Sequence, residues 1–170
     1  EIHHDSLQKT SEVTESKSTI TLDQITLTHG SNSSTPYTVT AAWTTKAQHN
    51  ISGAMDTLLL SIDQCLLSDG KVKIATNGTL NFGVEDAAYG EIVVEINDAA
   101  AFLKSDLIAP DKHALAITLL SDVMGSDVSD RKQTIITISR EKNGQWKIGK
   151  APLTELLDDG LMSIFIFSKK

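Results

Sequence analysis

The chain has 170 residues, of which 40% are hydrophobic, so it is long enough to bury the core of one domain. The formal net charge of −7 argues against nucleic acid or an anionic membrane surface as the main partner, because both attract basic proteins. Cys65 is the single cysteine, which excludes an internal disulfide. Aromatic residues make up only 5% of the chain, so we expect a mostly aliphatic core.

The first part of the chain is polar. Residues 1–18 are rich in Ser, Thr, Glu and Lys and have no periodic apolar face, which predicts a flexible tail. Residues 19–170 are then expected to form a single β-rich globular domain. The chain opens with Glu1 rather than Met, which predicts a fragment or a processed form. We expect a periplasmic or extracellular protein, with peripheral or tethered membrane association through a missing N-terminal segment.

Two stretches near the start alternate apolar and polar residues, as strands do. In residues 19–28 the alternation changes parity at Asp23-Gln24, which predicts a strand with a bulge. In residues 37–45 one face carries Tyr37, Val39, Ala41 and Trp43, and the other face carries threonines.

The rest of the chain predicts more strands and a few short helices. Asn77-Gly78 is a typical hairpin turn, so residues 71–76 and 79–82 are expected to pair around it. The expected strands are residues 91–96, 113–120, 133–139 and 161–167, the expected short helices are 98–105 and 153–159, and the expected polar loop is 121–132.

Residues 54–67 form the longest apolar run, and they fit two structures. At helical period Met55, Leu58, Leu59 and Ile62 share a face, and at period two Leu58, Leu60 and Ile62 also align. The run contains Ala, Met, Leu, Asp and Gln with almost no β-branched residues, which favours a helix. A strand remains the alternative.

Asn143-Gly144 predicts a hairpin that returns the chain to residues 146–148. This segment, NGQWKI, resembles the closing hairpin of NTF2-like domains, in which a helix lies on a curved sheet. The helix and strand expected after it depart from that pattern, so the resemblance assigns no residue a role.

These patterns together predict an α+β fold. We expect an antiparallel curved sheet of about seven strands, covered by one main helix at residues 54–68 plus short helices. If residues 54–68 are extended, the same strands predict an all-β sandwich.

Candidate sites for chemistry are weak in this sequence. The loop residues Asp122, Asp127, Ser129 and Asp130 offer oxygen ligands, but their spacing does not match a calcium-binding loop. Neither Cys65 nor any histidine accompanies a recognisable catalytic motif. We therefore predict no catalytic residue, no cofactor and no metal site. The other candidates weighed are His3, His4 and Asp5 as metal ligands, and His29, His49 and His113 as bases.

The sequence therefore favours a binding protein over an enzyme. The leading hypothesis is a non-catalytic interaction or assembly module of a bacterial envelope or secreted system, with a protein partner held at a strand edge. The alternative is a small-ligand domain, with scope for enzymatic activity, whose pocket between helix and sheet holds a small apolar ligand.

Overall fold

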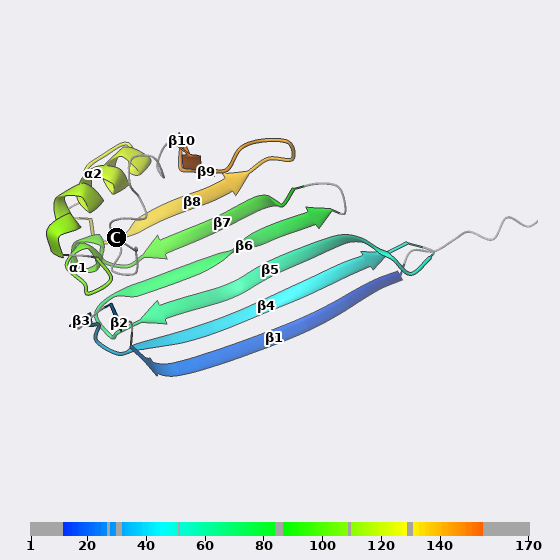
Figure 1. The fold of residues 1–170 in the computed structure, drawn as a ribbon, viewed down its shortest axis with the longest axis horizontal. Coiled ribbons are helices and arrows are strands. Elements are labelled where there is room, and N and C mark those ends of the chain that lie inside the picture. Colours follow the sequence, from blue (N-terminus) through cyan, green and yellow to red (C-terminus); the bar gives the residue numbers. More distant parts are fainter. Residues whose placement is uncertain are drawn as a thin grey trace, which may run out of the picture.

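One antiparallel sheet of eight strands dominates the computed structural model (Figure 1). The structure describes residues 12–26, 28–29, 32–50, 52–83, 87–108, 110–128 and 131–154. The strands follow the order β1-β4-β5-β6-β7-β8-β9-β10, so that each pairs with the next long strand along the chain. The expected antiparallel sheet is confirmed. It forms a single layer, and the described residues contain no second large sheet of the kind that a sandwich requires.

The strands shorten from one side of the sheet to the other. They are β1 (Glu12–Ile25), β4 (Tyr37–His49), β5 (Met55–Ser68), β6 (Lys73–Gly83), β7 (Tyr89–Ile96), β8 (Thr134–Arg140), β9 (Lys147–Ile148) and β10 (Ala151–Pro152). A separate small hairpin pairs β2 (Thr28–His29) with β3 (Asn32–Ser33). The helical elements are α1 (Ala99–Leu103), the 3₁₀ turn η1 (Pro110–Lys112) and α2 (His113–Met124).

The prediction of a main helix at residues 54–68 is wrong, because this stretch is the central strand β5. Its neighbours β4 and β6 pair with it along both edges. Leu60 and Ile62 face one side, and the register shift between Ile62 and Cys65 returns Cys65 and Leu67 to that same side. Backbone pairing on both edges and the shared apolar face outweigh the helical propensity of a leucine-rich sequence.

The prediction of a hairpin at Asn77-Gly78 is also wrong, because both residues lie within the continuous strand β6. Gly78 pairs with Ile92 of β7, and its φ is +149°. A Cβ atom there would lie 2.2 Å from the carbonyl oxygen of Glu91. The glycine is therefore needed for the close approach of two strands and not for a turn.

The prediction of a strand at residues 113–120 is wrong as well, because these residues begin the helix α2. The buried residues of this helix are Ala116, Leu119 and Val123, whose spacing follows a helical face. The helix ends at Gly125, whose φ of +65° is the left-handed conformation typical of a helix C-terminus. Four residues of the expected polar loop 121–132 therefore belong to the helix.

Several other predictions are confirmed. β1 has its irregularity between Leu22 and Ile25, and Gln24 there has a positive φ of 58°. The strands expected at 37–45, 91–96 and 133–139 are present as β4, β7 and β8. α1 replaces the expected helix 98–105, and the Asp98 carboxylate caps it by accepting a hydrogen bond from the Ala101 amide at 2.8 Å.

β1 starts earlier in the chain than the sequence predicts. Residues 12–18 were assigned to the polar tail, but they form the first half of β1. Their Ser and Thr side chains are compatible with an exposed strand, and pairing with β4 satisfies one side of their backbone. Residues 1–11 and 155–170 lie outside the described residues, so the strand expected at 161–167 and most of the helix expected at 153–159 do too.

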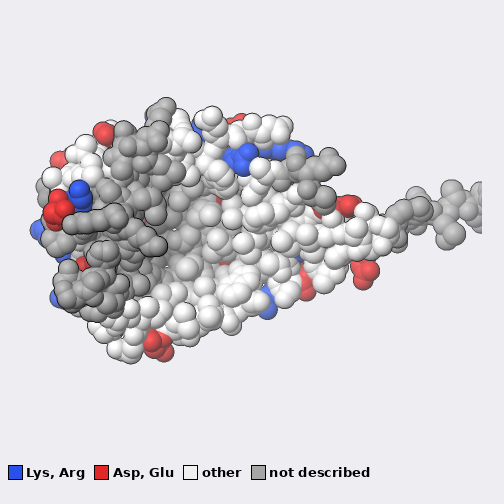
Figure 2. Space-filling view, in the orientation of Figure 1, with Lys and Arg blue, Asp and Glu red and all other residues white. Residues whose placement is uncertain are grey.

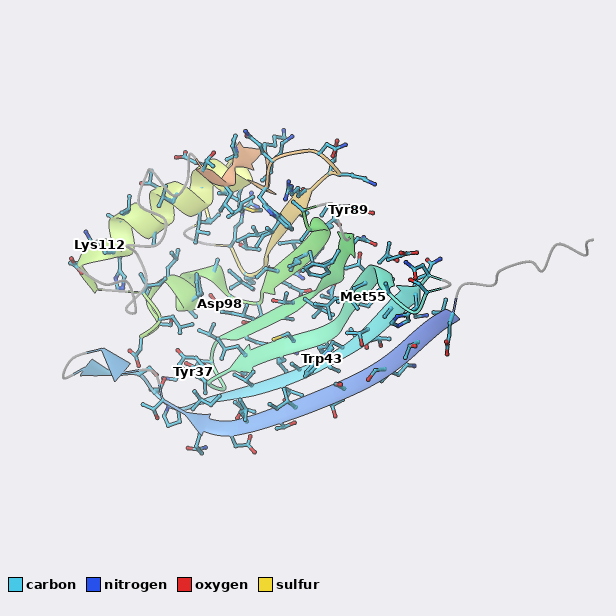
Figure 3. All side chains as sticks on the ribbon, turned by 45° about the vertical axis from the view of Figure 1, so that its right-hand side comes forward. Tyr37, Trp43, Met55, Tyr89, Asp98 and Lys112 are labelled. Carbon is cyan, nitrogen blue, oxygen red and sulfur yellow. The ribbon has the colours of Figure 1, made fainter. Side chains whose placement is uncertain are left out.

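The hydrophobic core lies between the helices and one end of the sheet. Figure 3 shows α1 and α2 over the concave side of the sheet, with Tyr37 at the end of β4 beside them and Trp43 farther along. No helix in the described part of the chain is long and apolar enough to cross a membrane. The buried core residues are Tyr37, Val72, Ile96, Phe102, Leu103, Leu107, Ile108, Ala116, Leu119, Val123, Val128 and Ile136.

The burial of the Tyr37 phenol predicts how the stability of the fold depends on pH. Its side chain is 1% exposed, and its hydroxyl has no hydrogen-bond partner among the described residues. Burial, followed by the negative charge of Asp69, raises the pKa of Tyr37 above its ordinary value of 10.0. The stability that depends on the neutral phenol is therefore complete below pH 10 and is lost as the pH rises through the raised pKa.

We therefore expect Tyr37→Phe to change the pH dependence of stability more than the stability itself. At pH 7 its free energy of unfolding should equal that of the wild type or exceed it by about 1 kcal/mol, because an unpartnered buried hydroxyl is removed. Above pH 10 the wild type should lose stability that the variant keeps. Urea denaturation at both pH values measures this, and parallel pH profiles for the two proteins would contradict it.

Candidate functional site: an apolar sheet face and an edge strand

One face of the sheet is apolar far beyond the area that the helices cover. Residues that pair directly across neighbouring strands share a face, so the strand register identifies this face. We call it the apolar face. Its apolar residues are Ile20, Leu22, Val39, Ala41, Trp43, Leu58, Leu60, Ile62, Cys65, Leu67, Ile74, Leu80, Phe82, Ile92, Val94, Ile96, Ile136 and Ile138.

The helices meet only one end of the apolar face. Leu67, Ile74 and Val94 pack against the buried core, which the helices complete. Leu60, Leu80 and their neighbours toward the other end of the strands do not belong to that cluster. In Figure 2 the described surface is mostly white, and its acidic and basic side chains lie mainly along the margin.

Charge is nearly absent from the apolar face. We consider Val39, Ala41, Trp43 and Thr45 of β4 and the residues that lie level with them on the same face of β1, β5, β6, β7 and β8. Arg140 is the one charged residue in this set. Its guanidinium donates hydrogen bonds to the carbonyl oxygens of Ala88 at 3.0 Å and Gly144 at 2.7 Å. Arg140 is therefore engaged at the rim, and the middle of the face offers only dispersion and hydrophobic contacts.

The two edges of the sheet differ in length and in chemistry. The far edge consists of β9 and β10, with two residues each, and of the start of β8, whose pairing with β9 begins at Ile138; β10 contains Pro152. Short strands and proline are common protections of an edge. The near edge is the 14-residue strand β1, which pairs with β4 on one side, except at Asp23 and Gln24, and with no strand of the described chain on the other.

β1 carries charged residues such as Lys17, which can protect an edge strand, but other protections are weak. It contains no proline, and its irregularity lies near its end, between Leu22 and Ile25. Ile20 and Leu22, at the margin of the apolar face, are 42% and 45% exposed. An edge with exposed aliphatic residues and unpaired backbone groups is a template for another strand.

The charges of β1 are unevenly paired. Glu15 lies 3.1 Å from the ammonium group of Lys46 on β4 and 3.9 Å from that of Lys17. Lys17 is 76% exposed at its side chain, and Asp23 has no salt bridge among the described residues. β1 therefore presents two exposed anions, Glu12 and Asp23, that have no salt bridge among the described residues, and one cation, Lys17, whose partner is Glu15 of the same strand.

A polar hollow of about 320 Å³ lies on the opposite face, beside the bulge of β5. Both of its carboxylates are hydrogen-bonded within the fold. Asp63 accepts a hydrogen bond from the Thr44 hydroxyl at 3.0 Å, and Glu95 accepts one from the amide of Gln133 at 2.8 Å. These bonds fix the hollow as part of the structure, and nothing in it resembles a pair of groups arranged for acid–base chemistry.

The candidate site residues named from the sequence do not come together in one place. Cys65 is half-buried on the apolar face, His49 ends β4 and His113 begins α2. Asp122 and Asp127 border a shallow hollow beside α2, whereas Ser129 and Asp130 lie outside the described residues. His29 lies in β2, and His3, His4 and Asp5 are outside the described chain. Within the described ranges no three metal-ligating side chains come together.

Comparison with known proteins found no matching family model, no matching curated protein and no matching solved structure. The resemblance of residues 143–148 to the closing hairpin of NTF2-like domains therefore depends on those six residues alone. The candidate site therefore consists of the apolar face and the β1 edge.

Proposed function

We propose that this protein is a non-catalytic interaction module that binds an extended segment of a partner protein as an additional strand along β1. The observation that carries the proposal is the 14-residue edge of β1, which has no neighbouring strand among the described residues. At ~3.3 Å per residue it offers about 46 Å of backbone hydrogen-bonding groups. The bacterial envelope or secreted setting is part of the same proposal and rests on the sequence.

Strand addition suits the chemistry of β1. In an antiparallel ladder each residue directs its N–H and C=O to the same neighbour, so alternate residues of β1 leave both groups pointing outward. These groups supply affinity without requiring particular side chains of the partner. Specificity would come from Ile20 and Leu22, because they flank the same edge on the apolar face.

A second candidate function follows from the apolar face itself. Its aliphatic surface between Trp43 and Leu80 carries no charge, and this would suit a small apolar ligand with a long aliphatic chain. The two candidates differ in what they perturb. A ligand on the face changes the fluorescence of Trp43, whereas a strand added to the edge changes the backbone of β1.

Panning with displayed random peptides of about twelve residues tests the proposed edge directly. We expect enriched peptides to bind the wild type, and we expect Ile20→Lys to weaken them about tenfold or more, which corresponds to ~1.4 kcal/mol. A lysine at this position of an edge strand opposes the docking of another strand. Isothermal titration calorimetry with the enriched peptides measures the change.

The matched control is Ile135→Lys. Ile135 is 50% exposed, similar to Ile20, but it lies on β8, at the other side of the sheet from β1 and on the opposite face. Its affinity for the peptides should stay within about twofold of the wild type, as for ordinary surface substitutions. Enriched peptides that bind the Ile20→Lys variant as tightly as the wild type would show that β1 is not the docking strand.

A further inference from the structure

Residues 12–22 of β1 form an unbroken ladder with β4, so their side chains alternate strictly between the two faces of the sheet. The even-numbered residues lie on the apolar face, because Ile20 pairs with Ala41 and Leu22 pairs with Val39. A strand added outside β1 places its own side chains level with these residues. The side chains that it meets on the apolar face are Glu12, Thr14, Ser16, Ser18, Ile20 and Leu22.

The chemistry of this margin changes along β1. The aliphatic residues Ile20 and Leu22 are neighbours on the face and are 42% and 45% exposed. The charged residue of the margin, Glu12, lies at the other end of the strand, across from His49 of β4. Small hydroxyl side chains separate Glu12 from Ile20. A complementary strand therefore needs aliphatic residues at one end and a cation at the other end of the same face.

Glu12 is the charge on β1 that is best placed to recognise a partner. It is exposed and forms no salt bridge with a described residue, His49 included. Glu15 and Lys17 lie on the opposite face, and Glu15 already pairs with a lysine of β4 at 3.1 Å. Asp23 lies in the bulge, where no register partner fixes its position. Since β1 contains three acidic residues and one basic residue, the whole strand favours a basic segment over an acidic one.

An antiparallel neighbour continues the pattern of the sheet, because its ladders between described strands are all antiparallel. In that direction the partner residue opposite Leu22 comes first, and the residue opposite Ile20 follows two positions later. We infer that the segment bound by β1 carries aliphatic residues at these two positions and lysine or arginine eight positions after the second, opposite Glu12. This inference rests on the proposed function, because it states the chemistry of the partner at the same edge.

Isothermal titration calorimetry with three synthetic peptides of about thirteen residues, capped at both ends, tests this inference. The first peptide has valine at its second and fourth positions, lysine at its twelfth, and threonine or serine elsewhere. The second peptide has glutamate in place of the lysine, and the third has the sequence of the first in reverse order. At low salt, where exposed charges are least screened, the wild type should bind the first peptide about fivefold more tightly than the second and about threefold more tightly than the third.

Glu12→Lys and Glu141→Lys make the same change of charge at different places. Glu141 is exposed and follows the end of β8, at the other side of the sheet from β1. Glu12→Lys should bind the second peptide at least as tightly as the first, because lysine at this position now faces a cation in the first peptide and an anion in the second. Glu141→Lys should keep the preference of the wild type for the first peptide, to within about twofold.

A preference that follows the charge of residue 12 in both directions establishes the inference. Equal binding of the first two peptides by the wild type, a preference for the third, or an unchanged preference in Glu12→Lys overturns it, as does a failure of all three peptides to bind. In each of these cases the proposed function stands if the peptides enriched by panning still bind along β1. If neither the synthetic nor the enriched peptides bind, both proposals fail.

Discussion

Replacing Gly78 by alanine is expected to lower the free energy of unfolding by about 3 kcal/mol. The new Cβ would lie 2.2 Å from the carbonyl oxygen of Glu91 and 2.7 Å from the Cα of Ile92. Both contacts are with backbone, which cannot move aside as a flexible side chain can. β6 and β7 would have to separate in the middle of the sheet, and their ladder hydrogen bonds would weaken. Urea denaturation followed by circular dichroism measures the loss.

Gly53→Ala is the matched control for this substitution. Gly53 also has a positive φ, +82°, but a Cβ built there meets nothing within 4 Å. Only the strain of a left-handed backbone remains, and the expected cost is about 1 kcal/mol. Equal losses in the two variants would mean that β6 and β7 do not approach each other as closely as the structure shows.

Phe102→Ala is expected to cost about 3–5 kcal/mol, because it removes a large aromatic side chain from the core and leaves a cavity. Phe102 is 5% exposed and belongs to α1, which lies over the sheet. Besides the lost burial, the change weakens the attachment of a helix of only five residues, which is too short to be stable alone. The free energy of unfolding from urea titration reports the effect.

Ile135, a large aliphatic residue outside the core, provides the control for Phe102→Ala. Ile135→Ala, at a side chain that is 50% exposed, should cost less than about 1 kcal/mol. A cost at Phe102 as small as that at Ile135 would show that the helices do not depend on this contact. The core would then have to be held together at other positions.

Local patterns predicted the strands with β-branched or alternating sequences, but not the middle of the sheet. Residues 37–45 alternate cleanly, residues 133–139 are rich in β-branched side chains, and both are strands. Residues 54–68 are rich in leucine, and their strand is determined by two neighbours that are distant in sequence, which no local propensity contains. Asn77-Gly78 is misleading for a related reason, since the glycine serves a contact with β7.

The candidate site was harder to predict than the fold. Its main element, β1, begins at Glu12, within the stretch that the composition assigned to a polar tail. The available signal was the alternation of Thr14, Ser16 and Ser18 with the apolar pair Ile20 and Leu22 at the same period. A strand with one exposed edge needs little apolar sequence, so polarity alone did not distinguish it from a tail.

Hydrogen exchange of the β1 amides, followed by NMR at the lowest workable protein concentration, tests the free edge most directly. We expect alternation along residues 16–22, with the amides that face β4 exchanging about 100-fold more slowly than those between them. Addition of a bound peptide should protect the fast set. Uniformly slow exchange in the dilute protein would mean that the edge is already occupied, and uniformly fast exchange would mean that β1 is not a strand.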